Sequence, residues 1–255
     1  MKKKFLVLCL AVRAATAQDI GTGLMPDGSA DTYVGASLRS SSPYLKGDAR
    51  SISVVPVLHI LCANGIFISS FGTAGWQLSD TPGVEYGPLF NSRNERAPTD
   101  HWQLAGTQRI KGTPDAGVFF NYALGDALWL RSGLTYDSNA RGLAFSAGVQ
   151  KTWARIAPHQ NLTLSLGLSA ANGQVMRQQY GVTGGDGNAP GPGDYLPNGG
   201  LASVNAGIDW NWAFNRNWLL NGGANVSHLG AAAADSPFIS QPNLIRYSAG
   251  LAYRF

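Results

Sequence analysis

The sequence predicts an all-β protein, a transmembrane antiparallel up-and-down β-barrel of about twelve strands, and three observations predict it. Hydrophobic residues make up 44% of the chain and charged residues 13%, but the hydrophobic residues alternate with polar ones instead of forming blocks. Beyond the amino terminus, no stretch approaches the eighteen or so apolar residues of a spanning helix, so only a closed barrel could cross a membrane. The carboxyl-terminal residues alternate between an apolar and a polar face, as a strand between lipid and a polar lumen does.

The closing strand, residues 244–255, carries the strongest signal. Its apolar face ends in Tyr253 and Phe255, and its polar face holds Arg246 and Arg254. A polar residue, a glycine and two aromatics in alternation at a carboxyl terminus resemble the insertion signal that bacterial outer-membrane barrels present to the barrel-assembly machinery. Here these residues are Ser248, Gly250, Tyr253 and Phe255. The alternative is an ordinary amphipathic strand that ends a soluble β protein.

Residues 1–17 have the features of a secretory signal peptide, with three lysines, the apolar run 5–12 and a small-residue cleavage site before Gln18. Arg13 is an irregularity, so the cleavage position is less well defined than the export. Cleavage removes four of the 19 basic residues and none of the 15 acidic ones, which leaves residues 18–255 with 15 of each and no net charge. We therefore expect no basic face that binds nucleic acid. Cleavage also removes Cys9 and leaves Cys62 as the single cysteine, so we expect no intramolecular disulfide.

The alternation predicts the strands in order along the mature chain. An Asn-Gly pair at 64–65 joins the second and third strands as a hairpin turn. Residues 161–171 alternate most regularly, with leucines opposite Thr163, Ser165 and Gly167. The strands at 86–91 and 102–110 have the weakest pattern, and a barrel of ten strands is the alternative without them. The predicted strands are 31–39, 50–61, 66–78, 86–91, 102–110, 115–124, 127–136, 142–153, 161–171, 201–214, 218–229 and 244–255.

The lengths of the links provide an independent test of this topology. Short links are expected at 62–65, 125–126, 154–160 and 215–217, and long ones at 40–49, 172–199 and 230–243. Outer-membrane barrels have an even strand number, short turns on the periplasmic side and long loops outside. If the carboxyl terminus is periplasmic, every short link named here is also periplasmic.

The faces of the strands predict an apolar outside and a polar inside. Aromatic residues gather at one end of two consecutive strands, where an interfacial girdle would lie; they are Trp210, Trp212, Phe214 and Trp218. The charged residues predicted to point into the lumen are Asp209, Arg131, Arg246 and Arg254. They could form a network that fills the narrow interior or a lining that selects solutes. A soluble barrel would instead leave extensive leucine and tryptophan faces in water.

Several short motifs resemble the MipA/OmpV family of outer-membrane proteins (MltA-interacting protein). They are Pro43, Tyr44 and Gly47; Tyr180, Gly181, Val182 and Thr183; Leu201 and the Trp-rich strand after it; Ala234, Asp235, Ser236 and Pro237; and the ending Tyr253, Arg254, Phe255. The resemblance implies a monomeric barrel in the bacterial outer membrane. Some members are described as scaffolds that bring a murein-degrading transglycosylase to a murein synthase, and others as pores, adhesins or antibiotic-responsive proteins. We therefore expect a scaffold, with a small-solute pore or an adhesin as the alternative.

Catalytic and metal sites are not expected. The histidines His59, His101, His159 and His228 are dispersed without the spacing of metal ligands. Residues 184–188 resemble one calcium-binding repeat, but a single copy is better explained as a loop. His228, Asp235 and Ser236 suggest a hydrolase set, as in barrel lipases, yet Ser236 lacks a nucleophile elbow and Asp-Ser-Pro is a turn sequence. The sequence thus predicts no enzyme, no cofactor and no metal.

Overall fold

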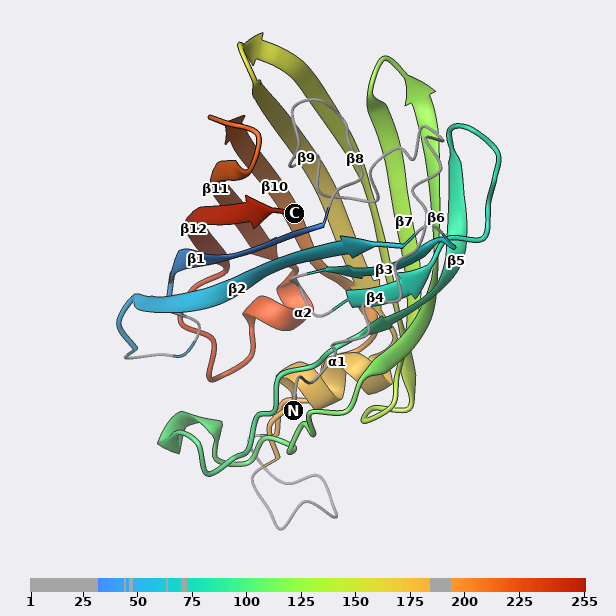
Figure 1. Ribbon diagram of the computed structural model, residues 1–255. Helices are drawn as coiled ribbons and strands as arrows, with labels where there is room; N and C mark the ends of the chain where they lie inside the picture. Colours follow the sequence, from blue (N-terminus) through green and yellow to red (C-terminus); the bar gives the residue numbers. More distant parts are fainter. Residues whose placement is uncertain (1–31, 44, 46–47, 63, 70–72, 184–193) are drawn as a thin grey trace, which may run out of the picture.

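The computed structural model describes residues 32–43, 45, 48–62, 64–69, 73–183 and 194–255. The predicted signal peptide lies outside these residues. Twelve strands form one closed antiparallel barrel, in which each strand pairs with its neighbours in sequence and β1 pairs with β12 (Figure 1). The strands are β1 (Tyr33–Ser41), β2 (Ser51–Leu61), β3 (Ile66–Ser69), β4 (Thr73–Trp76), β5 (Val84–Asn91), β6 (Asp115–Gly125), β7 (Leu128–Asp137), β8 (Gly142–Ala157), β9 (Gln160–Ala171), β10 (Gly200–Ala213), β11 (Trp218–Leu229) and β12 (Asn243–Arg254). The predicted fold class is confirmed.

The predicted strand at residues 102–110 is wrong. Trp102–Leu104 instead form a 3₁₀-helix, η1, and Leu104 is buried among other loop residues and not in a strand that faces lipid. The prediction of one strand over 66–78 is also wrong, because this stretch contains both β3 and β4. The predicted number of twelve strands is right because one predicted strand is absent and another is two strands. The sequence signal missed was Gly72, which interrupts the apolar alternation as turn residues do.

The strands are apolar outside and polar inside, as their alternation predicted. In β9, Asn161 and Thr163 are 2% and 5% exposed, whereas Leu166 is 60% exposed. A water-soluble barrel would show the reverse, because it buries its leucines. The wall therefore presents its apolar side chains to the lipid and its polar side chains to the lumen.

One rim of the barrel carries only short links, and we call it the turn rim. In the link between β6 and β7, Asp126 and Ala127 both have positive φ, 45° and 55°, as a two-residue hairpin turn requires. The predicted turn at 154–160 is shorter than expected, because β8 continues to Ala157 and a bulge shifts its register with β9. Both ends of the barrel sequence, Tyr33 and Arg254, pair at this rim.

The opposite rim carries the long loops, and we call it the loop rim. Residues 42–50, 92–114, 172–199 and 230–242 connect the strands there, at the lower end of Figure 1. Two short helices lie in these loops, α1 (Gly173–Tyr180) and α2 (Ala231–Ala234). Among the described residues, no helix is long and apolar enough to cross a membrane.

Candidate functional site: the cap and the lumen

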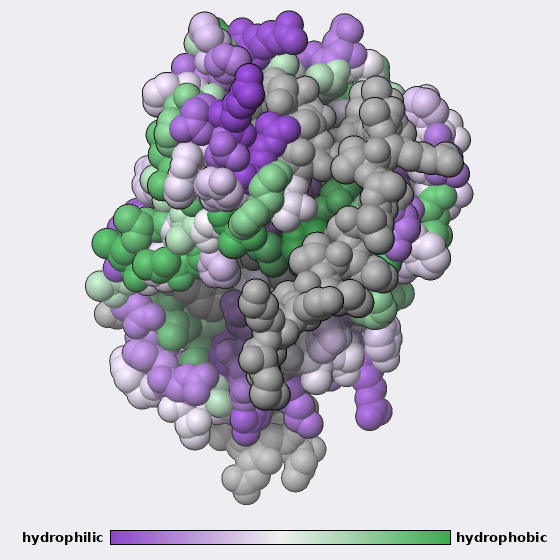
Figure 2. Space-filling view, viewed as in Figure 1, coloured by the Kyte–Doolittle hydropathy of each residue, from purple (hydrophilic) through white to green (hydrophobic). Residues whose placement is uncertain are grey.

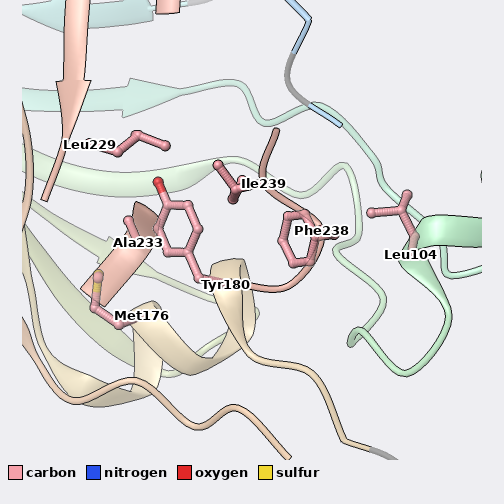
Figure 3. Packing of buried hydrophobic residues seen from close by; sticks show 7 residues of the cluster. All are labelled: Leu104, Met176, Tyr180, Leu229, Ala233, Phe238 and Ile239. Carbon is pink, nitrogen blue, oxygen red and sulfur yellow. The ribbon is translucent and has the colours of Figure 1, made fainter. Parts of the chain in front are cut away.

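The four long loops meet over the loop rim and bury a common apolar core. We call residues 42–50, 92–114, 172–183, 194–199 and 230–242 the cap. Met176 and Ala233 are fully buried there, and Phe238 is 2% exposed. Figure 3 shows how α1, α2 and the loop of η1 contribute to this core. Its buried residues are Leu104, Met176, Tyr180, Leu229, Ala233, Phe238 and Ile239.

Helix α1 forms because its sequence supplies a cap and one apolar side. The side chain of Asn172 accepts a hydrogen bond from Val175 N at 3.1 Å, which satisfies a free amide of the first turn. Val175, Met176 and Tyr180 are the buried apolar residues of the helix. Burial raises the pKa of the Tyr180 phenol, an effect that the nearby charge of Arg96 partly offsets.

Arg96 links the loop after β5 to the end of α1. Its guanidinium donates to the carbonyl oxygens of Gln179 and Gln178, at 2.9 and 3.1 Å. It also lies over the ring of Phe238, 5.4 Å from the ring centroid. A cation is favoured at a helix carboxyl terminus, so this one side chain joins three loops of the cap.

Three of the five pieces of sequence that resemble the MipA/OmpV family lie in this cap; the Trp-rich strand and the ending lie in the wall. Ser236 Oγ donates to the carbonyl oxygen of Tyr180 at 2.6 Å, and Ser240 Oγ donates to that of Pro43 at 3.1 Å. Thr183 N donates to Gly106 O at 2.8 Å. Tyr44 and Gly47 lie outside the described residues. The motifs therefore mark loop-to-loop contacts, which their positions in the sequence did not reveal.

Arg131 is part of a buried network on the inner wall of β5 to β7. Its guanidinium donates to Glu85 Oε2 at 2.8 Å, and Asn121 Nδ2 donates to the same oxygen at 2.8 Å. The guanidinium also lies 4.9 Å from the ring centroid of Trp129. Glu85 is 2% exposed, so the ion pair and the amide compensate the cost of burying its charge.

A second network ties the same strands together near the loop rim. Arg93 forms ion pairs with Asp115 and with Asp137, the latter at 2.8 Å. Asp137 is 1% exposed and also accepts the backbone amides of Asn139 and Ala140. Asp115 and Asp137 could not be predicted as lumen charges from the sequence, because Arg93 comes from another part of the chain.

The other predicted lumen charges lie on the inner face of β10 and β12 by alternation. Arg246 stands opposite Ser41 and Asn225, close to Arg39, which stands opposite Ser248. Asp209 extends across Gly223, where an added Cβ would meet its Oδ1 at 2.5 Å. Among the described residues, neither Arg246 nor Asp209 forms an ion pair, in contrast to the compensated charges of β5 to β7. Arg254 lies apart from them at the turn rim, opposite Tyr33.

The predicted girdle residues form two runs of ring contacts at the turn rim. The ring centroids of Trp210 and Trp212 are 6.2 Å apart, and those of Trp212 and Phe214 are 5.7 Å apart. Trp218 contacts Tyr253 edge-on at 5.1 Å, and Tyr253 contacts Phe255 at 5.2 Å. Tyr253 and Phe255 of the proposed insertion signal thus lie near Trp218. Gly250 and Ser248 lie further along β12, toward the loop rim. The insertion role stays a prediction.

The considered hydrolase residues have other partners. Ser236 is 2% exposed and its hydroxyl is bound to Tyr180, while His228 Nδ1 is 2.8 Å from Asn243 Oδ1. Within the part of the chain that the structure describes, no group of three or more His, Cys, Asp or Glu side chains could hold a metal ion. Residues 184–188 lie outside that part.

A membrane barrel with an apolar outside, a polar lumen and long loops at one rim has a porin-like outer-membrane fold. A family model described as MltA-interacting protein MipA matches residues 34–255. The chain therefore belongs to the MipA family, and the predicted family is confirmed.

The chain is similar to several solved barrels of the outer membrane, at low sequence identity. A KdgM porin has 8% sequence identity, with 88% of this chain and 99% of that chain covered and a TM-score of 0.48. A NanC porin has 8% identity, with 86% and 100% covered and a TM-score of 0.48. The COG4313 outer membrane channel of Pseudomonas putida F1 has 10% identity, with 89% and 96% covered and a TM-score of 0.45. Such distant likeness says nothing about a solute. No curated protein matches the chain.

Proposed function

We propose that the protein is an interaction protein of the bacterial outer membrane, a monomeric scaffold for murein-synthesising and murein-degrading enzymes, and not a permanently open pore or an enzyme. The observation that carries this proposal is the cap. Four loops bury a common apolar core over one mouth of the barrel, and Arg96 joins three of them. Because the cap covers one mouth of the lumen, the surfaces of the barrel are more accessible to a protein partner than the lumen is to a solute.

The proposed orientation has the loop rim outside the cell and the turn rim in the periplasm, where murein lies. The lengths of the links support it, because outer-membrane barrels have short turns on the periplasmic side and longer loops outside. The insertion signal at Phe255 would meet the barrel-assembly machinery from the same side. Heat-dependent mobility on gels and fractionation with outer membranes test this location; recovery as soluble periplasmic protein would contradict it.

The end of β8 is the surface we propose for a periplasmic partner. β7 begins at Leu128, opposite Lys151, so Trp153, Ala154 and Ala157 pair only with β9 among the described strands. Arg155 and Ile156 lie in the register shift between Ala154 and Ala157. Trp153 and Ile156 are 41% and 49% exposed, and Arg155 is exposed between them. A short open edge with exposed side chains can accept an extended segment of another protein as an added strand.

Two measurements on the folded full chain test the scaffold. In planar bilayers we expect no steady conductance, and in pull-downs we expect capture of a purified murein transglycosylase and a murein synthase. Arg155→Glu should weaken the capture, whereas Arg216→Glu, in the neighbouring turn of the same rim, should not. Steady discrete conductance without capture would contradict the scaffold and favour a pore.

A small-solute pore is the second candidate, and one observation favours it. The inner face of β8 to β10 includes several small residues, which fill less of the lumen than longer side chains would: Ser146, Gly148, Ser165, Gly167 and Gly207. If the cap alone closes this space, Arg96→Ala should produce conductance events that the wild type lacks. Conductance in both proteins would identify an open pore, and silence in both would leave the scaffold as the function.

A further inference from the structure

Arg50 places a cation on the outer face of the barrel, at the loop-rim end of β2. It directly precedes Ser51, the first residue of that strand, and its side chain is exposed. Ser51 pairs with Ser41, in the inward-facing row of Arg39, so by alternation Arg50 points outward, toward the lipid. From there to the turn rim every outward residue of β2 is apolar: Ile52, Val54, Pro56, Leu58 and Ile60. The outer face of this strand thus carries its charge only at the end next to the cap.

Contacts with two neighbouring strands hold the Arg50 side chain against the wall. Its Nη1 donates to Ser40 Oγ of β1 at 3.4 Å. Its Cζ lies 5.6 Å from the ring centroid of Tyr247 on β12, within the range of a cation–π contact. Ser40 and Tyr247 are directly paired, so the side chain extends from the start of β2 across β1 to β12. The guanidinium therefore lies on the outer face of the wall, over a tyrosine ring.

Most N–H donors of this guanidinium have no acceptor in the described part of the chain. A guanidinium carries several such donors in a planar fork, and Ser40 accepts from one of them. Within the same residues no carboxylate pairs with Arg50, because the acid nearest in sequence, Asp48, lies 3.3 Å from His101 instead. The contacts with Ser40 and Tyr247 thus position a charge that the protein leaves available to an anion.

This charge lies where the apolar outer face ends. The outward residues of β1 are Val34, Ala36 and Leu38, followed toward the loop rim by the polar Ser40. Figure 2 shows the same change, from apolar to hydrophilic side chains, on the face that β2 crosses. Tyrosine rings and long basic side chains at such a boundary place their polar ends among the lipid headgroups. Arg50 is therefore at the headgroup level of the leaflet on the loop-rim side.

An outward tyrosine elsewhere on the wall lacks this arrangement. Tyr136, near the loop-rim end of β7, is 46% exposed, close to the 51% of Tyr247. Among the described residues, no cation lies over its ring. Arg141, in the turn after β7, is exposed on the same rim and has no ion pair within those residues. Tyr136 and Arg141 thus have the residue types of the site without its geometry, and they serve as matched controls.

We propose that Arg50 and Tyr247 bind the phosphate headgroup of a lipid in the leaflet at the loop rim. The phosphate oxygens accept charge-assisted hydrogen bonds from the guanidinium, and the Tyr247 hydroxyl donates a further one. The acyl chains lie on the apolar residues next to them toward the turn rim, where Leu38 and Leu251 are 57% and 42% exposed. The site is independent of any murein partner and lies on the rim opposite the end of β8.

Binding of phosphatidic acid to the folded full chain tests the site. The protein in a non-ionic detergent is mixed with dioleoyl phosphatidic acid, and in parallel with dioleoylglycerol, which has the same chains and no phosphate. Native mass spectrometry measures the lipid that stays bound. We expect phosphatidic acid to be retained and dioleoylglycerol to be lost. Equal retention of the two lipids would overturn the proposal.

Variants of the two residues test which groups recognise the phosphate. Arg50→Gln should lower the affinity for phosphatidic acid about tenfold, the loss expected for one charge-assisted hydrogen bond, whereas Arg141→Gln should leave it unchanged. Tyr247→Leu should lower it severalfold, and Tyr136→Leu should not. Heat-dependent mobility on gels shows that each variant is folded. Equal losses in Arg50→Gln and Arg141→Gln would mean that only the net charge of the rim matters, and would overturn the site.

A competition experiment distinguishes a lipid from a free anion. Inorganic phosphate and glycerol phosphate carry the same charged group without acyl chains. At millimolar concentration we expect neither to displace phosphatidic acid from the wild type, because the chains on the apolar wall add to the affinity. Displacement by either one would show that the site recognises a soluble anion, and would overturn the lipid site.

Discussion

The wall from β8 to β11 and the wall from β2 to β5 differ in how much of each strand is paired. β8 to β11 have 16, 12, 14 and 12 residues, and β9 and β10 pair with both neighbours along nearly all of their length. β3 and β4 have four residues each, beside an eleven-residue β2. The long strands contact α1 and α2 of the cap, whereas β3 and β4 form a short hairpin between β2 and β5. One barrel thus combines a wall of long strands under the cap with a wall of short strands, and each needs different interactions to hold it.

The largest effect is expected where the two walls are joined. Arg93→Ala would leave the buried carboxylates of Asp115 and Asp137 close together without their cation. Removing one partner from a buried network costs about 3–5 kcal/mol of unfolding free energy. Urea unfolding followed by tryptophan fluorescence would measure it.

A matched control exists nearby in the same loop. Arg109 pairs with Glu95, but both side chains are more than half exposed, at 62% and 52%. Arg109→Ala should therefore leave the urea midpoint unchanged. Equal loss of stability in both variants would mean that the two walls are not held together by buried charge.

The next largest effect should be confined to the cap. Met176→Ala removes a fully buried side chain, and such a change costs about 2–5 kcal/mol. We expect faster hydrogen exchange in α1 with an unchanged unfolding midpoint for the barrel. Leu164→Ala, on the lipid face of β9, is the control and should leave exchange in α1 as it is. A shifted barrel midpoint in Met176→Ala would show that cap and wall unfold together.

A smaller effect on stability, with a larger one on assembly, is expected at the carboxyl terminus. Phe255 is 76% exposed, so Phe255→Ala should cost about 1 kcal/mol or less, below the value for full burial. Loss of an insertion signal would act earlier, on a chain with unpaired strand edges. The amount of the Phe255→Ala variant in the outer membrane should fall severalfold, while the melting temperature of the assembled variant changes little. Normal abundance with a strongly reduced melting temperature would identify Phe255 as a packing residue.

The smallest effect is expected at the contact between His101 and Asp48, which joins two cap loops. His101 Nε2 lies 3.3 Å from Asp48 Oδ1, and both side chains are about one-third exposed, at 32% and 36%. Exposed pairs contribute about 0.2–1 kcal/mol, so Asp48→Asn should change hydrogen exchange in the cap only slightly. A change as large as that of Met176→Ala would show that this contact, and not the apolar core, holds the loops.

The sequence predicted those parts of the fold that depend on neighbours along the chain. The leucines of β9 and the rings at the end of β10 repeat every second residue, so their outward direction could be read locally. Alternation failed over residues 102–110, where Leu104 belongs to the core of the cap and Trp102 is exposed. It also extended one strand through the β3–β4 turn, because both sides of the turn alternate.

The candidate site was less predictable than the fold, because its contacts join distant residues. Arg131 was predicted to face the lumen, but its partner Glu85 became apparent only once β5 and β7 were placed on either side of β6. Ser236 attracted attention as a nucleophile, whereas its contact with Tyr180 spans more than fifty residues of sequence. Arg96 gave no signal at all, since capping a helix in another loop leaves no local pattern.

The cap also has a consequence for the order of events during biogenesis. Its core joins Leu104, Tyr180 and Phe238, which come from three loops held in position by different strands. Contacts over such sequence distances form late, because the intervening chain must first be organised. The wall itself closes only when β12 pairs with β1, the two ends of the barrel sequence. A newly inserted molecule should therefore pass through an uncapped stage, in which its lumen is briefly accessible from the loop rim before the loops pack together.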